Sequence, residues 1–353
     1  MLSYRMIDYA GALEPFSSAD PEPRGDEVVV RVTACGVCHS DVHLRDGFYD
    51  HGDGKHVKLP RGVADLPHVL GHEIVGEVAA VGPGATSVRV GDRRIVYPWI
   101  GCGACDVCLA GNEILCVRPR TIGISLPGGY ATHVVVPHER YLVDPGDLSD
   151  GVACTLACSG LTAYGALRKV GSLGERDTLL IVGAGGVGLA AIGLARAVTG
   201  VAPVVVDIDP AKREAALAAG AREAIDGREL DASTLIKRSA GRFAAAIDFV
   251  GAEPTAKLGF DVLRMGGTLV CVGLFGGALR VPLPLLPLRV LTLRGSYVGS
   301  LAELREVVAL ARGGDVHAVP IETRPLARAE ATLEDLKAGR ILGRVVLAPS
   351  GGA

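Results

Sequence analysis

The sequence lacks a long hydrophobic run. Among its 353 residues, no uninterrupted apolar stretch is long enough to span a membrane. The most apolar candidate, residues 281–288, is interrupted by prolines. The N-terminal segment carries Arg5 and Asp8 where a secretory signal peptide would have an apolar core. These features predict a cytoplasmic protein that does not cross a membrane.

An excess of positive charge is also missing. The chain has 36 Lys and Arg against 39 Asp and Glu, a net charge of −3, and no run of basic residues. This argues against a surface for nucleic acid or anionic lipid. Apolar residues make up 49% and charged residues 21%, as in ordinary globular enzymes, and the length predicts two or three domains.

Cysteine, by contrast, is plentiful, and four of the nine cysteines lie close together at Cys102, Cys105, Cys108 and Cys116. Thiolates at this spacing can close around one tetrahedral Zn²⁺. Two disulfides are the alternative, but a chain of this length without an export signal has little need of them. The spacing therefore predicts a structural zinc site that has no open coordination position.

The pattern of secondary structure changes near residue 160. Before it, short β-branched segments separated by Gly and Pro predict an all-β region, with strands at 27–33, 73–81 and 132–136. After it, strands alternate with helices, which predicts a doubly wound parallel sheet. The expected strands are 178–182, 204–207, 244–250 and 267–272, with helices at 187–199 and 211–219; a helix at 301–311 and a strand at 343–347 follow.

A glycine-rich turn follows the strand at 178–182 and opens a helix. It contains Gly183, Gly185, Gly186, Val187 and Gly188. Between a strand and a helix, this pattern predicts a dinucleotide site in which the pyrophosphate lies at the helix N-terminus. Asp207 ends the next strand, where a carboxylate binds the adenine ribose and favours NAD over NADP. Asp207 could instead be a turn or capping residue, although Asp209 is better placed to cap.

A second set of metal-binding and proton-transferring side chains is spread along the chain. Cys38, His39, Ser40, Asp41 and His43 follow the strand at 27–33, His72 and Glu73 precede the strand at 73–81, and Cys158 lies where the pattern changes. Two cysteines and a histidine would leave one zinc position open, as a catalytic zinc requires.

These motifs, in this order, resemble the zinc-dependent medium-chain alcohol dehydrogenases of the yeast and bacterial branch, from about residue 5 to residue 348. The resemblance implies a GroES-like β-rich catalytic domain and a Rossmann NAD-binding domain, an α/β fold. The implied boundaries are 1–158, with the zinc lobe at about 97–118, then 159–297, and a C-terminal return to the catalytic domain at 298–353.

The resemblance also implies roles for particular residues. Cys38, His72 and Cys158 would bind the catalytic zinc, with Glu73 as a nearby acid and Asp41 orienting His72. Ser40 and His43 would carry the proton, and His39 would contact the pyrophosphate. The remaining expected cofactor contacts are Thr162, Val250, Val272 and Val298 at the nicotinamide, Lys212 near the adenine ribose and Arg344 near the pyrophosphate.

Some positions stay open. Cys154 lies four residues before Cys158, on the same face of any helix there, while Cys35 and Cys271 match no ligand position. Tyr97 and Trp99 are candidates for the substrate pocket. An insertion at about 49–63 predicts a polar surface loop beside the catalytic ligands, with a lid as the alternative.

The expected function is reversible hydride transfer between an alcohol held at zinc and NAD(H), giving an aldehyde or ketone, with two zinc ions per chain. The alternatives are a polyol or sugar dehydrogenase of the same superfamily and a zinc-stabilised binding protein without catalysis. The segment 289–294 predicts a further strand of the parallel sheet. Together with its neighbours in 281–297, it predicts pairing with a second copy of the chain at a sheet edge, giving a homodimer or a tetramer of two dimers.

Overall fold

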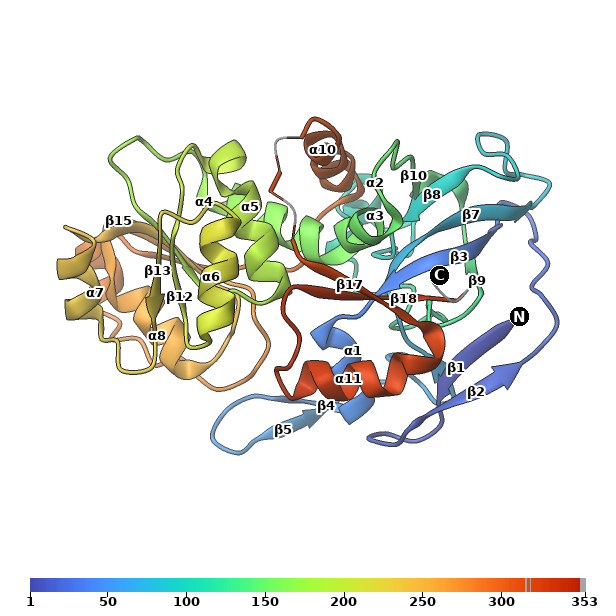
Figure 1. The fold of residues 1–353 in the computed structure, drawn as a ribbon, viewed down its shortest axis with the longest axis horizontal. Helices are drawn as coiled ribbons and strands as arrows, with labels where there is room; N and C mark the ends of the chain where they lie inside the picture. Colours follow the sequence, from blue (N-terminus) through green and yellow to red (C-terminus); the bar gives the residue numbers. More distant parts are fainter. Residues whose placement is uncertain (315, 318, 350–353) are drawn as a thin grey trace.

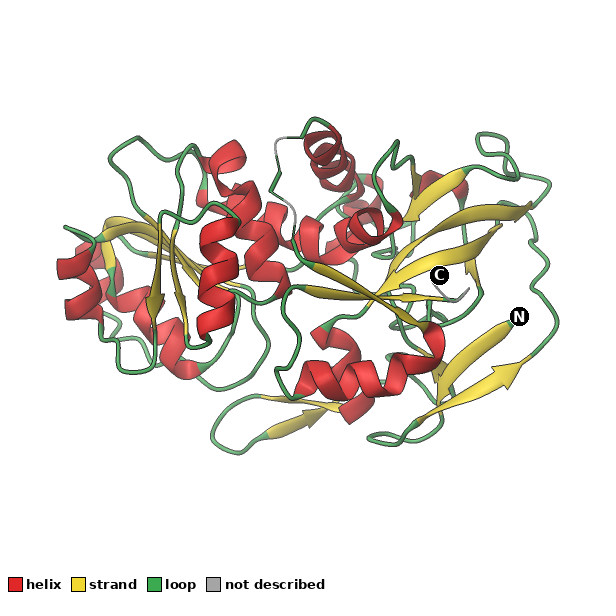
Figure 2. Cartoon of the chain, viewed as in Figure 1, coloured by secondary structure: helices red, strands yellow, loops and turns green. Residues whose placement is uncertain are grey.

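The computed structural model describes residues 1–314, 316–317 and 319–349. Its described residues form two units side by side, one built on a mixed sheet and one on a parallel sheet (Figures 1 and 2). Within this part of the chain, no helix is both long and apolar enough to cross a membrane. The end of the expected C-terminal segment, residues 350–353, lies outside the described residues.

The first unit contains a seven-stranded sheet in the order β10-β8-β7-β3-β18-β17, with β9 also paired to β3. Its long central strands alternate β-branched residues that pack into one continuous core. The strands are β3 (Val28–Gly36), β7 (Glu73–Val81), β8 (Arg93–Val96), β9 (His133–Val136), β10 (Leu142–Val143), β17 (Ile321–Pro325) and β18 (Arg344–Ala348). A smaller sheet joins β1 (Leu2–Met6), β2 (Leu13–Ser17) and β6 (His68–Val69).

The second unit holds a six-stranded sheet in the order β13-β12-β11-β14-β15-β16, and its neighbouring strands are all parallel. This is the dinucleotide-binding strand order, in which the order of the strands along the sheet reverses between β11 and β14. The prediction of a doubly wound parallel sheet is confirmed. The strands are β11 (Leu179–Val182), β12 (Val204–Asp207), β13 (Glu223–Asp226), β14 (Phe243–Asp248), β15 (Leu263–Cys271) and β16 (Thr292–Gly295).

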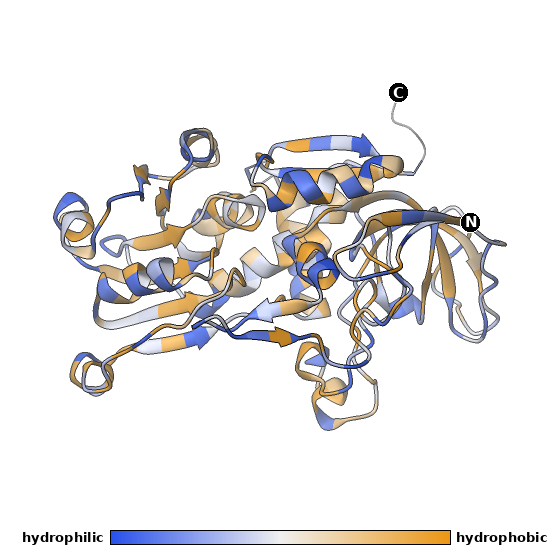
Figure 3. Cartoon of the chain, turned by 90° about the horizontal axis from the view of Figure 1, so that it is seen from below, coloured by the Kyte–Doolittle hydropathy of each residue, from blue (hydrophilic) through white to orange (hydrophobic). Residues whose placement is uncertain are grey.

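Helices cover both units. Apolar residues gather on the strands and on the helix faces turned towards them, as Figure 3 shows by colour. The helices of the second unit are α5 (Gly186–Thr199), α6 (Pro210–Ala218), α7 (Ala232–Arg238), α8 (Glu253–Asp261) and α9 (Leu285–Arg289). The join between the units is a continuous helical stretch of α3 (Asp150–Thr155), the π-helix η3 (Leu156–Gly160) and α4 (Leu161–Val170).

The C-terminal part of the chain returns to the first unit. After α10 (Leu301–Arg312), the strands β17 and β18 flank η4 (Leu326–Arg328) and α11 (Ala329–Lys337), and β18 pairs antiparallel with β3. The chain thus passes through the second unit and ends in the sheet of the first.

Two segments differ from expectation. The predicted surface loop at 49–63 begins with a hairpin of β4 (Phe48–Asp50) and β5 (His56–Lys58), held by backbone pairing that its polar sequence does not reveal. The predicted strand at 289–294 begins later, at Thr292, because α9 and a turn occupy the preceding residues.

Candidate active site

Four ligand-type side chains from three separate segments meet where the two units join. Cys38 precedes α1 (His39–Asp46), His72 and Glu73 open β7, and Cys158 lies in the π-helix η3. One ligand atom from each lies within 4.8 Å of the others, and all four residues are buried. The structure therefore brings together the three expected zinc ligands and the expected nearby acid.

The other cysteines of this region lie outside the cluster. Cys154, one helical turn before Cys158, is fully buried, and its Sγ donates to the carbonyl oxygen of Gly151 at 3.4 Å. Cys35 is also fully buried, with its Sγ directed to the carbonyl oxygen of Gly36 at 3.7 Å. Both behave as small apolar core residues.

The donor set fits a zinc ion. Among the described residues, Nε2 of the buried His72 has no hydrogen-bond partner, whereas Nδ1 faces a carboxylate. A buried imidazole nitrogen beside two thiols is costly unless it binds something, and Zn²⁺ is bound by this combination of sulfur and nitrogen. The shared hydrogen bond between Cys38 and Cys158 lowers the pKa of Cys38 well below its ordinary value and raises that of Cys158.

Asp41 contacts both segments that carry the ligands Cys38 and His72. Its Oδ1 lies 3.3 Å from Nδ1 of His72 and accepts the backbone N–H of Gly71 at 3.3 Å. Its Oδ2 accepts the N–H of Cys38 at 3.0 Å and the hydroxyl of Tyr130 at 3.1 Å. The carboxylate thus connects both ligand-bearing segments and faces the ring of His72.

Glu73 and Arg344 form a buried ion pair next to the cluster. Burial raises the pKa of Glu73 to about 7, although the positive charge of Arg344 opposes the rise. Glu73 also accepts the N–H of Ser159 at 3.3 Å. Arg344 packs against the glycine-rich turn as well, since a Cβ on Gly186 would lie 2.4 Å from its Cδ. Arg344 therefore links the zinc cluster to the dinucleotide turn.

The second cluster consists of the four expected lobe cysteines, half of them only partly buried. Cys105 Sγ lies 3.4 Å from Cys108 Sγ and 3.8 Å from Cys116 Sγ. The N–H groups of Cys102 and Arg118 both donate to Cys116 Sγ at 3.3 Å. A hydrogen bond from the backbone of Ala104 helps to lower the pKa of Cys102 to about 6. This sulfur cage suits a closed, structural zinc site.

One supporting residue of the lobe was not identified from the sequence. Glu113 is buried, accepts the N–H of Gly101 and the hydroxyl of Tyr141, each at 2.8 Å, and pairs with Arg140. It fixes the start of the cysteine segment to the first unit. A charged residue inside a cysteine-rich loop is expected to be exposed to solvent, so no pattern in the sequence indicates this role.

The glycine-rich turn has the geometry of a dinucleotide site. Gly183 has a φ of +91° and lies against Val250, and a Cβ on Gly188 would meet the carbonyl oxygen of Gly183 at 1.9 Å. Gly185, the N-cap of α5, has nothing within 4 Å of the position of a Cβ. The turn is therefore closed on the sheet side and open beside the helix N-terminus, where a pyrophosphate fits.

Asp207 lies at the carboxyl end of β12, beside this turn. Its Oδ2 accepts the N–H of Ala184 at 2.7 Å, and its Oδ1 accepts the N–H of Asp209 at 2.9 Å. Asp209 caps α6 through Ala211 and Lys212, as expected. Asp207 therefore shapes the turn, and its position suits the predicted ribose contact.

The other expected cofactor residues surround the same edge of the sheet. Val250 and Val272 follow β14 and β15, Thr162 lies in the first turn of α4, and Lys212 lies in α6. Val298 is buried, and its carbonyl oxygen would lie 2.5 Å from a Cβ on Gly165.

On the side of the cluster that faces α1, Ser40 and His43 lie on one helix. Ser40 Oγ is 3.8 Å from Cys38 Sγ, and the ring of His43 is 5.4 Å from that of Tyr49. Trp99 is buried, with its ring 5.4 Å from that of His72 and 5.5 Å from that of Tyr297.

Tyr97 differs from Trp99. It is fully buried, and its hydroxyl donates to the carbonyl oxygen of Gly299 at 2.9 Å, so its side chain packs in the core. Tyr49 and Tyr297 were not identified as site residues from the sequence, because they come from the inserted hairpin and from the other unit. Partial burial, and then the charge of Cys38, raise the pKa of Tyr49.

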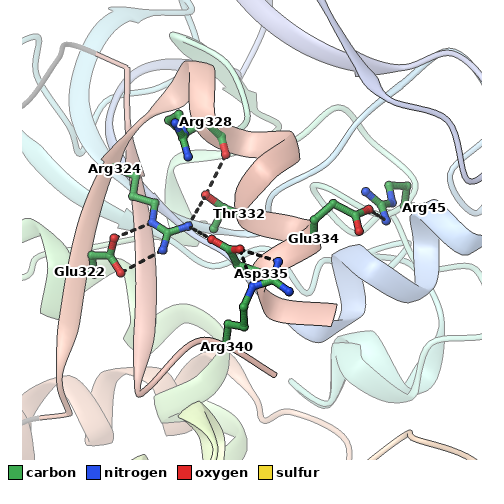
Figure 4. A network of polar contacts seen from close by, with 8 residues as sticks. All are labelled: Arg45, Glu322, Arg324, Arg328, Thr332, Glu334, Asp335 and Arg340. Carbon is green, nitrogen blue, oxygen red and sulfur yellow. Dashed lines mark hydrogen bonds and ion pairs between the residues drawn. The ribbon is translucent and has the colours of Figure 1, made fainter. Parts of the chain in front are cut away.

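Helix α1, which carries Ser40, Asp41 and His43, is held by the C-terminal helix. The buried guanidinium of Arg45 pairs with Glu330 and Glu334 of α11. Figure 4 shows Arg45 reaching Glu334 beside the network that ties α11 to β17. The return of the chain to the first unit thus supports the candidate active site.

Comparisons with known proteins agree with this geometry. Residues 24–145 match the family described as alcohol dehydrogenase GroES-like domain, and residues 186–313 match that described as zinc-binding dehydrogenase. An NAD-dependent alcohol dehydrogenase of Sulfurisphaera tokodaii is 38% identical over 352 residues, covering 99% of this chain and 100% of that protein.

Solved structures are similar as well. The alcohol dehydrogenase from the archaeon Aeropyrum pernix has a TM-score of 0.88 at 31% identity, with 99% of this chain and 100% of that chain covered. The D-arabinose dehydrogenase from Sulfolobus solfataricus has a TM-score of 0.84 at 28% identity, with 99% of each chain covered.

Proposed function

Since the chain belongs to the medium-chain zinc alcohol dehydrogenase family and is an NAD-dependent alcohol dehydrogenase, we propose that its reaction takes place at the Cys38 cluster. The observation that carries this proposal is the buried His72, which faces Asp41 with Nδ1 while its Nε2 has no hydrogen-bond partner among the described residues and lies in a cluster with two thiols. Arg344 connects this cluster to the glycine-rich turn, so metal and dinucleotide would lie side by side.

Cys38, His72 and Cys158 would hold the catalytic zinc. A zinc ion there would act as a Lewis acid on the oxygen of an alcohol or carbonyl. Asp41 would fix the ring orientation of His72 and raise its basicity. Glu73, held by Arg344, would remain beside the ligands as an acid of raised pKa.

The proton released from the alcohol would leave along α1. Ser40 is next to the ligand Cys38, and His43 lies one turn further along the same helix face. Burial lowers the pKa of His43, which favours the neutral ring that can accept a proton. These roles, with Ser40 first and His43 last, follow the family pattern.

The cofactor would bind across the carboxyl edge of the parallel sheet. The pyrophosphate would lie at the glycine-rich turn, formed by Gly183, Gly185, Gly186, Val187 and Gly188, with His39 and Arg344 beside it. The nicotinamide half would contact Thr162, Val250, Val272 and Val298. The adenine ribose would contact Asp207 and Lys212. The parallel strand order and the open N-terminus of α5 support this arrangement.

Substitution of Asp207 tests the proposed binding of the adenine ribose. Asp207→Gly should weaken NAD binding and reduce discrimination against NADP, because both the ribose acceptor and the charge repulsion are lost. Asp207→Asn is the matched control: it keeps a side-chain acceptor for the N–H of Ala184 and removes the charge. Titration of both variants with NADH and NADPH separates these effects. A wild-type preference for NADP would contradict the role of Asp207.

Simple primary alcohols, with secondary or aryl alcohols as further substrates, are the proposed substrate class. Ser40 is a small side chain beside the cluster, and the aromatic rings of Trp99 and Tyr297 meet edge to face there. The likeness to a D-arabinose dehydrogenase keeps a sugar or polyol as the second candidate. Polyol dehydrogenases of this superfamily typically have an acidic residue at the position of Cys158. The cysteine therefore favours a simple alcohol as the substrate.

Absorbance at the NADH band with a panel of alcohols, polyols and sugars tests the function. Turnover of simple alcohols with higher kcat/KM than any sugar supports the proposal. Turnover of sugars alone would identify a sugar dehydrogenase. No turnover of any alcohol or aldehyde by zinc-loaded protein would favour a binding protein instead.

Assembly as a homodimer through residues 281–297, and of two dimers into a tetramer, is also proposed. Strand β16 lies at the edge of the six-stranded sheet, and Leu283, Leu288 and Val290 near it are 75%, 70% and 65% exposed. Light scattering that reports a monomer at micromolar concentration would contradict this proposal.

The proposed division of the chain is 1–158 and 298–353 for the catalytic domain and 159–297 for the NAD-binding domain. The pairing of β18 with β3 supports it. A cytoplasmic, reducing environment is also proposed, because none of the nine cysteines forms a disulfide and most of them lie in the two clusters that would bind zinc.

A further inference from the structure

The tip of the β4–β5 hairpin has one buried residue among exposed neighbours. His51, Asp53, Gly54 and Lys55 are exposed, whereas Gly52 is buried. Gly52 is also fixed within the turn, since its N–H donates to Asp50 Oδ1 at 2.8 Å and its carbonyl accepts the N–H of Lys55 at 2.9 Å. Something outside the hairpin therefore covers Gly52.

The covering segment belongs to the other unit. A Cβ on Gly52 would lie 2.8 Å from the carbonyl carbon of Gly277 and 2.9 Å from the backbone nitrogen of Ala278. From the opposite side, a Cβ on Gly276 would lie 2.6 Å from Cβ of Asp50. The backbones of the two units touch here because glycine lies on both sides of the contact. Figure 1 shows the hairpin projecting beneath α11 towards the second unit.

This contact continues to the dinucleotide turn. The N–H of Gly276 donates to the carbonyl oxygen of Gly251 at 2.9 Å, and the N–H of Phe275 donates to that of Val250 at 3.2 Å. Val250 packs on Gly183, the first glycine of the turn. The ring of Phe275 also lies 5.5 Å from that of His39, on the first unit.

We propose that the β4–β5 hairpin is a clasp between the two units, in which Gly52 seats the hairpin tip on residues 276–278 and thereby slows release of the bound dinucleotide. The inference rests on the proposed NAD site. A dinucleotide lying along the strand ends would be enclosed between His39 and α1 on one side and residues 250–276 on the other. Its departure would require the units to separate, and separation breaks the clasp.

The clasp is a close backbone contact, not an ionic one. Asp53 and Arg280 do approach each other across the same junction, at 3.7 Å. Their side chains are 80% and 83% exposed, however, so solvent screens the pair and its contribution is small. The close backbone approach at Gly52 is the element that a substitution would disturb most.

The hairpin offers a matched pair of substitutions. Gly52 and Gly54 have φ values of +83° and +71°, so alanine strains the turn at either position. Only Gly52 faces the other unit, because nothing lies within 4 Å of a Cβ on Gly54. A difference between Gly52→Ala and Gly54→Ala therefore reports the contact between units and not the strain of the turn.

Two readouts test the clasp. Stopped-flow displacement of NADH should show that Gly52→Ala raises the dissociation rate about fivefold or more, while Gly54→Ala and Arg280→Gln stay within about twofold of wild type. Amide hydrogen exchange without cofactor should become faster at Gly276 in Gly52→Ala than in Gly54→Ala, as its bond to Gly251 loosens. Ala278→Leu crowds the same junction from the other unit, so it should raise the NADH dissociation rate and the exchange at Gly276 as Gly52→Ala does. It is the variant to measure if the Gly52→Ala protein does not fold.

Equal NADH release and equal exchange at Gly276 in the Gly52→Ala and Gly54→Ala proteins would overturn the clasp. Failure of the proposed function gives a different result: the wild-type protein would not bind NADH at all. The exchange measurement needs no cofactor, so it decides whether the junction exists in either case.

Discussion

The four-cysteine lobe and the Cys38 cluster collect similar ligand atoms by different routes. The lobe takes its four thiols from residues 102–116, and two of them are only partly buried. The Cys38 cluster takes its ligands from residues 38–158, from three segments, and all of them are buried. A local site can form as soon as its short loop closes, whereas the distributed site exists only when both sheets and the π-helix are assembled.

Chemistry follows from this difference. The lobe surrounds its metal position with sulfur on every side, so metal binding there contributes to folding. The cluster offers three proposed ligands and an adjacent acid, with Trp99 beside His72, so a metal bound there would keep a position for a substrate. Loss of the first site should therefore lower stability, and loss of the second should lower turnover.

The largest expected effect comes from Cys38→Ser. Removing one catalytic ligand should lower kcat/KM by about a thousandfold or more, because the Lewis acid is lost or misplaced. The melting temperature should change little, since the lobe is intact. Cys35→Ala, a buried neighbour outside the cluster, is the control and should keep both zinc and turnover. Comparable losses in the two variants would point to a packing effect.

A smaller loss is expected for Asp41→Asn. The uncharged amide faces Nδ1 of His72 less favourably, so zinc affinity and kcat/KM should fall about 10- to 100-fold. Tyr130→Phe removes one hydrogen bond to the same carboxylate and should have a weaker effect. Zinc titration and steady-state kinetics measure both. Unchanged zinc affinity in Asp41→Asn would contradict the orienting role.

The smallest effect on turnover is expected for Cys105→Ser, which should instead lower the melting temperature by about 5 °C or more. The folded fraction should keep near-normal kcat. Cys271→Ser, at a thiol outside both clusters, is the control for the chemical change. Thermal unfolding followed beside activity gives both numbers. A large loss of kcat with unchanged stability would mean that the roles of the two sites are reversed.

The same contrast explains what the sequence could predict. The lobe could be predicted from the sequence because its four cysteines lie in one short segment. The glycine-rich turn could be predicted because a strand precedes it and a helix follows it. Strands β7 and β12 were predicted at their observed bounds, since alternating or continuous β-branched residues specify them. The ligands of the Cys38 cluster needed a family resemblance, because no spacing rule joins residues 38, 72 and 158.

What the sequence could not indicate depends on contacts between distant segments. The hairpin β4–β5 lacks apolar alternation, and Gly52 is buried only by the other unit. Tyr97 and Trp99 are both aromatic and two residues apart, yet the hydroxyl of Tyr97 donates to Gly299 and the ring of Trp99 lies beside His72. Tyr297 reaches Trp99 from across the junction of the units. Each of these positions is decided by the assembled fold.

Zinc content is the most direct test of the central claim that two independent sites exist. Protein purified without chelator should contain two zinc ions per chain, Cys38→Ser should retain one in the lobe, and Cys105→Ser should retain one in the cluster. Elemental analysis of the three proteins, with activity measured on the same samples, provides the numbers. One zinc or none in the wild type, or loss of both ions from either variant while it remains folded, would contradict the account.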